Sequence, residues 1–263
     1  RGWVITGFPW LFLGYSHIDS LLRGWATVFG AYGVSFAIAQ TAGAIVCLYF
    51  YRKKIKSIIL LILLITTLWI GGYCLAKINW TKKTDTPIKV SLIQGNISLD
   101  QKWNENEWLS ILNSYTILTA QNFSSKLIVW PEAAIPVLTA DAQFYLKLLS
   151  KTAKKYNTTI LSGVSFYDSQ AGNYSNGILA FGANEGRYHK RHLVPFGEYL
   201  PLRFMLGWLH NYLMIPMSDF SSGTKNQPAL LIGKTLLAPF ICYEIAYANL
   251  VLDYLPKAGI LVT

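Results

Sequence analysis

Two long runs without a charged residue dominate the first third of the chain. They cover residues 25–51 and 57–76, and the short stretch between them contains Arg52, Lys53, Lys54 and Lys56. Runs of 27 and 20 residues are long enough to cross a lipid bilayer as helices. The alternative, two buried helices of a soluble protein, fits poorly with a basic turn directly between them. We therefore expect transmembrane helices at about residues 25–51 and 57–76.

The composition of the chain agrees with this expectation. Of its 263 residues, 52% are hydrophobic and 14% are charged, whereas soluble domains carry about 25% charged residues. These values exclude a disordered chain, a coiled coil and an ordinary soluble domain. The net charge is +10, and +6 of it falls within residues 1–80, beside the apolar runs. Because no basic stripe with interleaved aromatic residues occurs in the polar part, we expect no nucleic-acid partner.

The lysines and arginines also predict an orientation in the membrane. The basic turn between the two runs favours the cytoplasmic side, so both helices would emerge on the opposite face. Lys77, Lys82, Lys83 and Lys89 lie on that other side and weaken the signal. Residues 2–23 are aromatic and interrupted by glycine and proline, which predicts an interfacial or re-entrant loop. We expect residues 1–80 to form the membrane part.

From about residue 87 the sequence changes to an α/β pattern. Short β-branched runs predict strands, and stretches with helical spacing predict helices between them. The expected strands are residues 88–94, 126–130, 159–166, 175–181, 236–241 and 259–263, and the expected helices are residues 105–121, 142–156 and 249–255. Strands alternating with helices indicate an α/β domain over residues 81–263.

Two strand ends of this domain carry side chains that could do chemistry. Cys242 follows an apolar strand, at the sheet edge where α/β sites form, and the Tyr243 N–H could stabilise a thiolate or an oxyanion there. Glu132 follows another strand in an apolar, proline-flanked turn, where we expect desolvation to raise its pKa toward the range of a general base. A buried, inert cysteine and an acid that stabilises a helix N-terminus remain the alternatives.

A third segment, residues 187–199 (RYHKRHLVPFGEY), gathers basic side chains and two histidines before an acid. The two histidines lack a third metal ligand at a recognisable spacing. The three cysteines, Cys47, Cys74 and Cys242, include no C-x-x-C pair, which disfavours a zinc or thioredoxin-like site. We expect neither a metal nor a cofactor.

Together these segments resemble the Glu-Lys-Cys pattern of the nitrilase, or carbon–nitrogen hydrolase, superfamily. The similarity is closer to its membrane branch, the apolipoprotein N-acyltransferase family. It runs through nearly the whole chain, in GFPW at 7–10, LGYS at 13–16, VSLIQGNI at 90–97, KW at 102–103, WPE at 130–132, HLVPFGE at 192–198 and ICYEI at 241–245.

This resemblance implies a fold and a set of site residues. The fold would be a nitrilase-like αββα sandwich, incomplete at its C-terminal end, preceded by transmembrane α-helices. Glu132 matches the general base, Lys190 the lysine on the oxyanion side, and Cys242 the nucleophile. Further matches to functional positions are Glu198, Tyr243, Glu244, Trp103 and Asn176.

The resemblance also implies a reaction. Cys242 would take an acyl chain from a phospholipid as a thioester. The acceptor would be the α-amino group of the N-terminal diacylglyceryl-cysteine of a bacterial apolipoprotein, in the last step of lipoprotein maturation. The expected partners are thus phospholipid, diacylated apolipoprotein and the membrane. The expected location is the bacterial inner membrane, crossed several times, with the catalytic domain in the periplasm.

Two alternatives and one expectation about the chain's extent remain. The protein could be a membrane-anchored amidase of the same superfamily, in which water accepts the acyl group. It could also be a non-catalytic remnant that binds lipid or lipoprotein. Because the chain begins at Arg1 within apolar sequence and ends within a strand, we expect it to be a fragment of a longer protein and to be inactive by itself.

Overall fold

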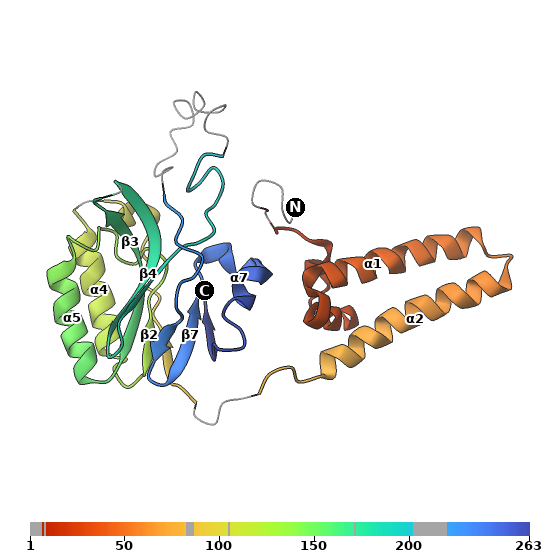
Figure 1. The fold of residues 1–263 in the computed structure, drawn as a ribbon, viewed down its shortest axis with the longest axis horizontal. Helices are drawn as coiled ribbons and strands as arrows, with labels where there is room; N and C mark the ends of the chain where they lie inside the picture. Colours follow the sequence, from red (N-terminus) through yellow and green to blue (C-terminus); the bar gives the residue numbers. More distant parts are fainter. Residues whose placement is uncertain (1–6, 8, 83–86, 105, 171, 202–219) are drawn as a thin grey trace. The chain divides into compact units, whose positions relative to one another are not determined.

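The computed structural model describes residue 7 and residues 9–82, 87–104, 106–170, 172–201 and 220–263. The chain divides into two compact units, Arg1–Thr84 and Asp85–Thr263 (Figure 1). Each unit has its own architecture and is described separately.

The first unit is a helical hairpin. The two uncharged runs form α1 (Ala26–Phe50) and α2 (Ile55–Lys77), as predicted, and the basic turn joins them. Two 3-10 helices, η2 (Leu13–His17) and η3 (Leu21–Trp25), precede α1. The described part of the expected interfacial or re-entrant loop is therefore made mainly of short helical turns.

Close backbone contact holds this hairpin together. A Cβ atom on Gly24 would lie 1.9 Å from the carbonyl oxygen of Gly72, so only glycine allows η3 to approach α2 so closely. The Trp25 indole donates a hydrogen bond to the Leu68 carbonyl oxygen at 2.8 Å. Most large apolar side chains of α1 and α2 remain exposed. Helices of this length with apolar surfaces and small residues at their contacts are those of a membrane protein.

The second unit contains two β-sheets. The first has five strands, namely β1 (Val90–Leu92), β2 (Leu127–Val129), β3 (Thr159–Asp168), β4 (Asn173–Gly182) and β5 (Gly186–His189), in that order. Strands β1, β2 and β3 are parallel, whereas β4 and β5 are antiparallel to their neighbours. The second sheet consists of β6 (Leu230–Ile232), β7 (Thr235–Pro239) and β8 (Ile260–Val262), with β7 and β8 parallel.

Side-chain alternation along the strands builds four layers. In β2, Leu127 packs toward the second sheet, whereas Ile128 packs toward α4 (Trp108–Ala120) and α5 (Gln143–Lys155). In β7, Leu237 packs toward the first sheet and Ala238 lies on the side of α7 (Ala248–Leu252). Figure 1 shows α4 and α5 on one side of this unit and α7 on the other. The predicted αββα sandwich is confirmed.

Three short elements were missed by the sequence patterns. The helix α3 (Leu99–Lys102) has only four residues, too few for a periodic pattern. Strand β5 lies inside the basic segment and has a single buried side chain, Tyr188. Strand β6 has three residues and ends at a turn in which Gly233 has a φ of +61°. Each is too short or too polar to show the alternation that predicts a strand.

Candidate active site

Cys242 lies where β7 gives way to a 3-10 helix, η4 (Cys242–Ala246). Its φ is +55°, a left-handed conformation that costs a non-glycine residue about 1–3 kcal/mol. Its side chain is exposed, so the alternative of a buried, inert cysteine is wrong. A sharp turn directly after the buried residues Phe240 and Ile241 thus presents the thiol at the edge of the second sheet.

Glu132 lies in the turn after β2, across from Cys242. A Cβ atom on Gly163 of β3 would lie 2.5 Å from the Ala133 nitrogen and 2.6 Å from the Glu132 Cα, so glycine lets the turn rest directly on β3. The expectation of a desolvated carboxyl is wrong, because Glu132 is exposed. The apolar residues beside it in the sequence, Ala134 and Ile135, point into the core instead.

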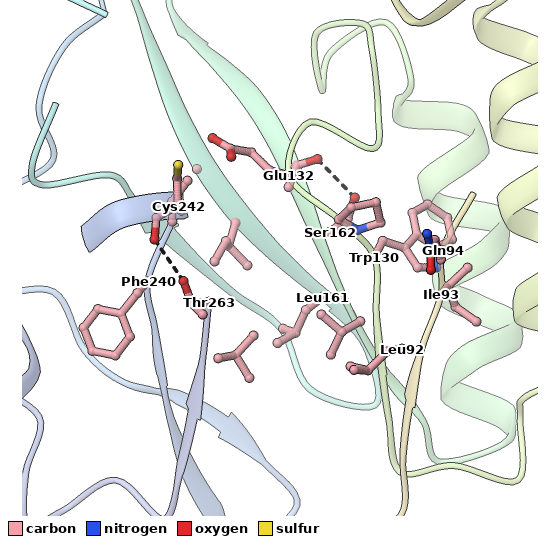
Figure 2. A pocket seen from close by; sticks show the side chains of 17 residues that line it. Leu92, Ile93, Gln94, Trp130, Glu132, Leu161, Ser162, Phe240, Cys242 and Thr263 are labelled. Atoms are coloured by element: carbon pink, nitrogen blue, oxygen red, sulfur yellow. Dashed lines mark hydrogen bonds between the residues drawn. The ribbon is translucent and has the colours of Figure 1, made fainter. Parts of the chain in front are cut away.

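Glu132 and Cys242 line the same pocket, which has a volume of about 260 Å³. Figure 2 shows the Glu132 carboxylate and the Cys242 sulfur at the same end of it. The pocket lies between the two sheets at the carboxyl ends of their strands, the usual position of a site in an α/β fold. Its lining is mostly apolar, including Leu92, Val129, Trp130, Leu161, Ile178, Phe240, Ile241 and Val262, with Gln94, Ser162 and Thr263 as the added polar side chains.

A chain of hydrogen bonds connects Glu132 to Lys190. The Asn176 amide nitrogen donates to the Glu132 carboxylate at 2.8 Å and to the Glu198 carboxylate at 3.3 Å. Glu198 accepts a further hydrogen bond from the Lys190 ammonium at 2.8 Å. Lys190 is almost fully buried, with 1% of its side chain exposed, so its charge needs this partner. One amide therefore holds two carboxylates beside a single buried cation.

Glu244 fixes the segment that carries Lys190 against the strand end that carries Cys242. Its fully buried carboxylate accepts hydrogen bonds from the backbone N–H groups of Arg191, His192 and Ile241, at 2.7, 2.9 and 2.8 Å. The Tyr188 hydroxyl also donates to it. Burial raises the pKa of Glu244, although these hydrogen bonds oppose the shift. The geometry assigns Glu244 a positioning role.

Tyr243 lies beneath the lysine. The Lys190 ammonium is 5.8 Å from the centre of the Tyr243 ring, and the Tyr243 hydroxyl donates to the Leu193 carbonyl oxygen at 3.1 Å. The ring is buried, and burial raises the pKa of the Tyr243 hydroxyl well above its usual value. Tyr243, the residue next to Cys242 in the sequence, therefore packs against Lys190.

Trp103 lies apart from these groups. It is exposed and lines a neighbouring groove of about 560 Å³ with Trp108 and Tyr174. Lys190 is likewise absent from the lining of the Cys242 pocket, and hydrogen bonds through Glu198 and Asn176 connect it to Glu132. The structure thus gathers Glu132, Asn176, Glu198, Lys190, Tyr243, Glu244 and Cys242 around one site and leaves Trp103 beside it.

Sequence patterns missed the role of Lys102. Its ammonium donates to the backbone carbonyl oxygen of Glu132 at 3.0 Å, across 30 positions of sequence. The only available signal was its place in the KW pair at 102–103, which by itself indicates no partner. Within the ranges that the structure describes, no group of three or more His, Cys, Asp or Glu side chains could hold a metal ion.

Comparison with known proteins identifies the family to which the chain belongs. Residues 89–263 match the carbon-nitrogen hydrolase family model, and the chain belongs to that family. Residues 1–44 match the model of the apolipoprotein N-acyltransferase N-terminal domain. The predicted resemblance to this membrane branch is therefore confirmed.

Individual relatives agree with this branch. The chain is 41% identical over 262 residues to an apolipoprotein N-acyltransferase of Coxiella burnetii, covering 100% of this chain and 54% of the relative. It is 38% identical over 263 residues to the protein of that name in Methylococcus capsulatus, covering 100% and 52%. The chain thus spans about half the length of the curated relatives it matches.

Solved structures also show similarity. A carbon-nitrogen hydrolase from Helicobacter pylori gives a TM-score of 0.46 at 16% identity, covering 66% of this chain and 58% of that one. A nitrilase-superfamily member from Saccharomyces cerevisiae gives a TM-score of 0.47 at 17% identity, covering 66% and 62%.

Proposed function

We propose that this chain carries the acyl-transfer site of an apolipoprotein N-acyltransferase. One observation carries the proposal: an exposed thiol and a carboxylate, Cys242 and Glu132, line one pocket with mostly apolar walls. Apolar walls suit an acyl chain, and a thiol beside a base suits covalent transfer. The membrane helices would keep the site near lipid-anchored substrates.

In the first step, Glu132 accepts the thiol proton as Cys242 attacks an ester carbonyl carbon of a phospholipid. The resulting oxyanion needs positive charge, which Lys190 supplies, together with the Tyr243 N–H. Lys190 donates to Glu198, which also accepts a hydrogen bond from Asn176, so Lys190 would act from the far end of this chain of hydrogen bonds. When the tetrahedral intermediate collapses, the carbon–oxygen bond breaks and the lysophospholipid leaves with the proton from Glu132. The acyl chain remains on Cys242 as a thioester.

In the second step, the α-amino group of the diacylglyceryl-cysteine of an apolipoprotein attacks the thioester carbonyl. Glu132 accepts a proton from the amine, and the thiolate of Cys242 leaves and takes that proton from Glu132. The product is an amide, and the enzyme returns to its starting state. A thioester is reactive enough toward an amine for this step, so no cofactor is needed. Trp103, in the groove beside the Glu132 turn, would contact one of the lipid substrates.

Labelling of the full-length protein tests this function. After incubation with phospholipid, wild-type protein should carry an acyl adduct on Cys242 that hydroxylamine removes, and Cys242→Ala should carry none. Glu132→Gln should form the adduct much more slowly. Addition of a diacylated lipopeptide should discharge the adduct as an N-acyl product. An adduct that persists in Cys242→Ala contradicts the proposal, and discharge of wild-type protein to free fatty acid alone would identify an amidase instead.

The location is proposed with the function: a multi-pass protein of the bacterial inner membrane with residues 81–263 in the periplasm. The basic turn between α1 and α2 supports a cytoplasmic position for that turn. In a background without the native cysteines, a cysteine at Lys54 should resist an impermeant thiol reagent in intact cells. A cysteine at Lys225 should react, and the reverse pattern would overturn this topology.

A further inference from the structure

Lys102 contacts the turn that carries Glu132 from outside the Cys242 pocket. It is the last residue of α3, whose first turn is capped by the Ser98 hydroxyl. Its ammonium donates to the Glu132 backbone oxygen at 3.0 Å. It lines two grooves to which this turn also contributes, of about 560 and 220 Å³. The half-buried ammonium therefore lies where the turn meets α3.

The Glu132 turn needs such support. Ala133, the next residue, has a φ of +47°, a conformation that costs about 1–2 kcal/mol for a residue with a side chain. The Glu132 carboxylate is exposed and accepts a hydrogen bond from Asn176 at 2.8 Å. A backbone in an unfavourable conformation, with an exposed functional side chain, gains order from a charged donor on its carbonyl oxygen.

The charges around Glu132 point the same way. The negative Glu198 lies on the far side of Asn176 and is itself paired with Lys190. Asp141 is a further acid that lines a groove together with Lys102. Burial lowers the pKa of the Lys102 ammonium, while the charge of the Glu132 carboxylate opposes that shift. The same attraction helps to keep the Lys102 ammonium beside the Glu132 turn.

We propose that Lys102 is a positioning residue for Glu132, which it holds in place through a hydrogen bond to the backbone carbonyl oxygen. This inference rests on the proposed function, because it assumes that Glu132 is the base that activates Cys242. It assigns α3 a role in the first chemical step, although Lys102 touches neither the pocket nor the reacting atoms.

The test compares Lys102→Met, Lys102→Arg and Lys89→Met in the full-length protein. Lys89 is a matched control, because its ammonium also makes a hydrogen bond, to the Ser124 hydroxyl at 2.7 Å, but lies outside the lining of the pocket. The measurement is the single-turnover rate of Cys242 acylation by phospholipid, as a function of phospholipid concentration. Thermal unfolding of each variant is followed in parallel.

Lys102→Met should slow acylation about tenfold or more at saturating phospholipid. The half-saturating phospholipid concentration should not change, because Lys102 lies outside the pocket lining. Lys102→Arg should restore most of the rate, and Lys89→Met should resemble wild type. A wild-type rate in Lys102→Met would overturn the inference, as would a change in half-saturation alone or a lower rate explained by loss of the fold. If Glu132→Gln and Cys242→Ala also acylate normally, the proposed function itself has failed.

Discussion

Helices α2 and α5 use the same apolar residue types in opposite ways. In α2, leucines and isoleucines point in all directions, and Gly72 is the buried residue. In α5, Leu146, Leu149 and Ala153 are buried against the first sheet, and lysines occupy the exposed face. The side-chain arrangement of α2 thus suits an apolar solvent on all sides, whereas that of α5 suits water on one side and the protein core on the other. The stability of each unit therefore depends on a different kind of contact, and substitutions can affect one kind without the other.

The largest effect should follow from removing the buried carboxylate that joins two segments of the second unit. Glu244→Ala leaves three backbone N–H groups and the Tyr188 hydroxyl without this acceptor. We expect a loss of about 3 kcal/mol or more, measured by thermal unfolding of the detergent-solubilised protein. Glu185→Ala, at an exposed acid in the same unit, is the control and should change little. Equal effects would contradict the role assigned to Glu244.

A charge placed on each helix tests the comparison directly. Leu63 in α2 and Leu148 in α5 are similarly exposed, at 59% and 61%. Leu63→Arg should disfavour membrane insertion by about 2.5–3.5 kcal/mol, whereas Leu148→Arg should change stability by no more than about 0.5 kcal/mol. The measurements are the fraction of protein resistant to alkaline extraction and the thermal midpoint. If both variants insert equally well, α2 is not in contact with lipid.

Two glycines distinguish open from crowded backbone. In Gly163→Ala the new methyl group would meet the Glu132 turn, whereas a methyl group added at Gly43 in α1 would have nothing within 4 Å of it. Gly163→Ala should cost about 1–3 kcal/mol and slow acylation of Cys242. Gly43→Ala should be neutral or slightly stabilising, because alanine favours the helix. A Gly163→Ala protein with normal acylation would show that the turn does not depend on this close approach.

The smallest effect concerns pH. Burial, and then the charge of Lys190, lower the pKa of His192 below its ordinary value of 6.5. The folded protein therefore keeps His192 neutral while the unfolded chain takes up a proton. The stabilisation is fully present above about pH 6.5 and is lost as the pH falls toward the folded pKa. His192→Gln should show a flatter dependence of the thermal midpoint between these pH values, and an unchanged slope would argue against a half-buried neutral histidine.

The sequence predicted much of the fold because its long patterns reflect the surroundings of each element, which are lipid for α1 and α2 and the protein core for the strands. The uncharged runs indicated α1 and α2, and the β-branched runs indicated β2, β3 and β4. Those patterns could not predict that Glu132 is exposed, because the burial of a turn depends on which strand crosses beneath it, here β3 at Gly163.

Contacts across long sequence distances could not be predicted either. The pairing of Lys102 with the Glu132 carbonyl oxygen and the bridge from Asn176 to two carboxylates join residues 30, 44 and 22 positions apart. Family resemblance indicated Asn176 as a functional residue. The register of β4 against β3 and β5 is what brings the Asn176 amide between Glu132 and Glu198.

That register also affects the chemical lifetime of the site. Asn176 is followed by Gly177, the pairing in which a flexible chain most readily loses ammonia, because the glycine nitrogen can attack the side-chain amide. In β4, Asn176 is paired with β3, and Gly177 is paired with both β3 and β5. The Asn176 amide also donates hydrogen bonds to two carboxylates. Folding thus protects the Asn176 side-chain amide from deamidation. A chain that stayed unfolded would acquire an acid at this position, and on refolding would bring three negative charges together where the site is built for two.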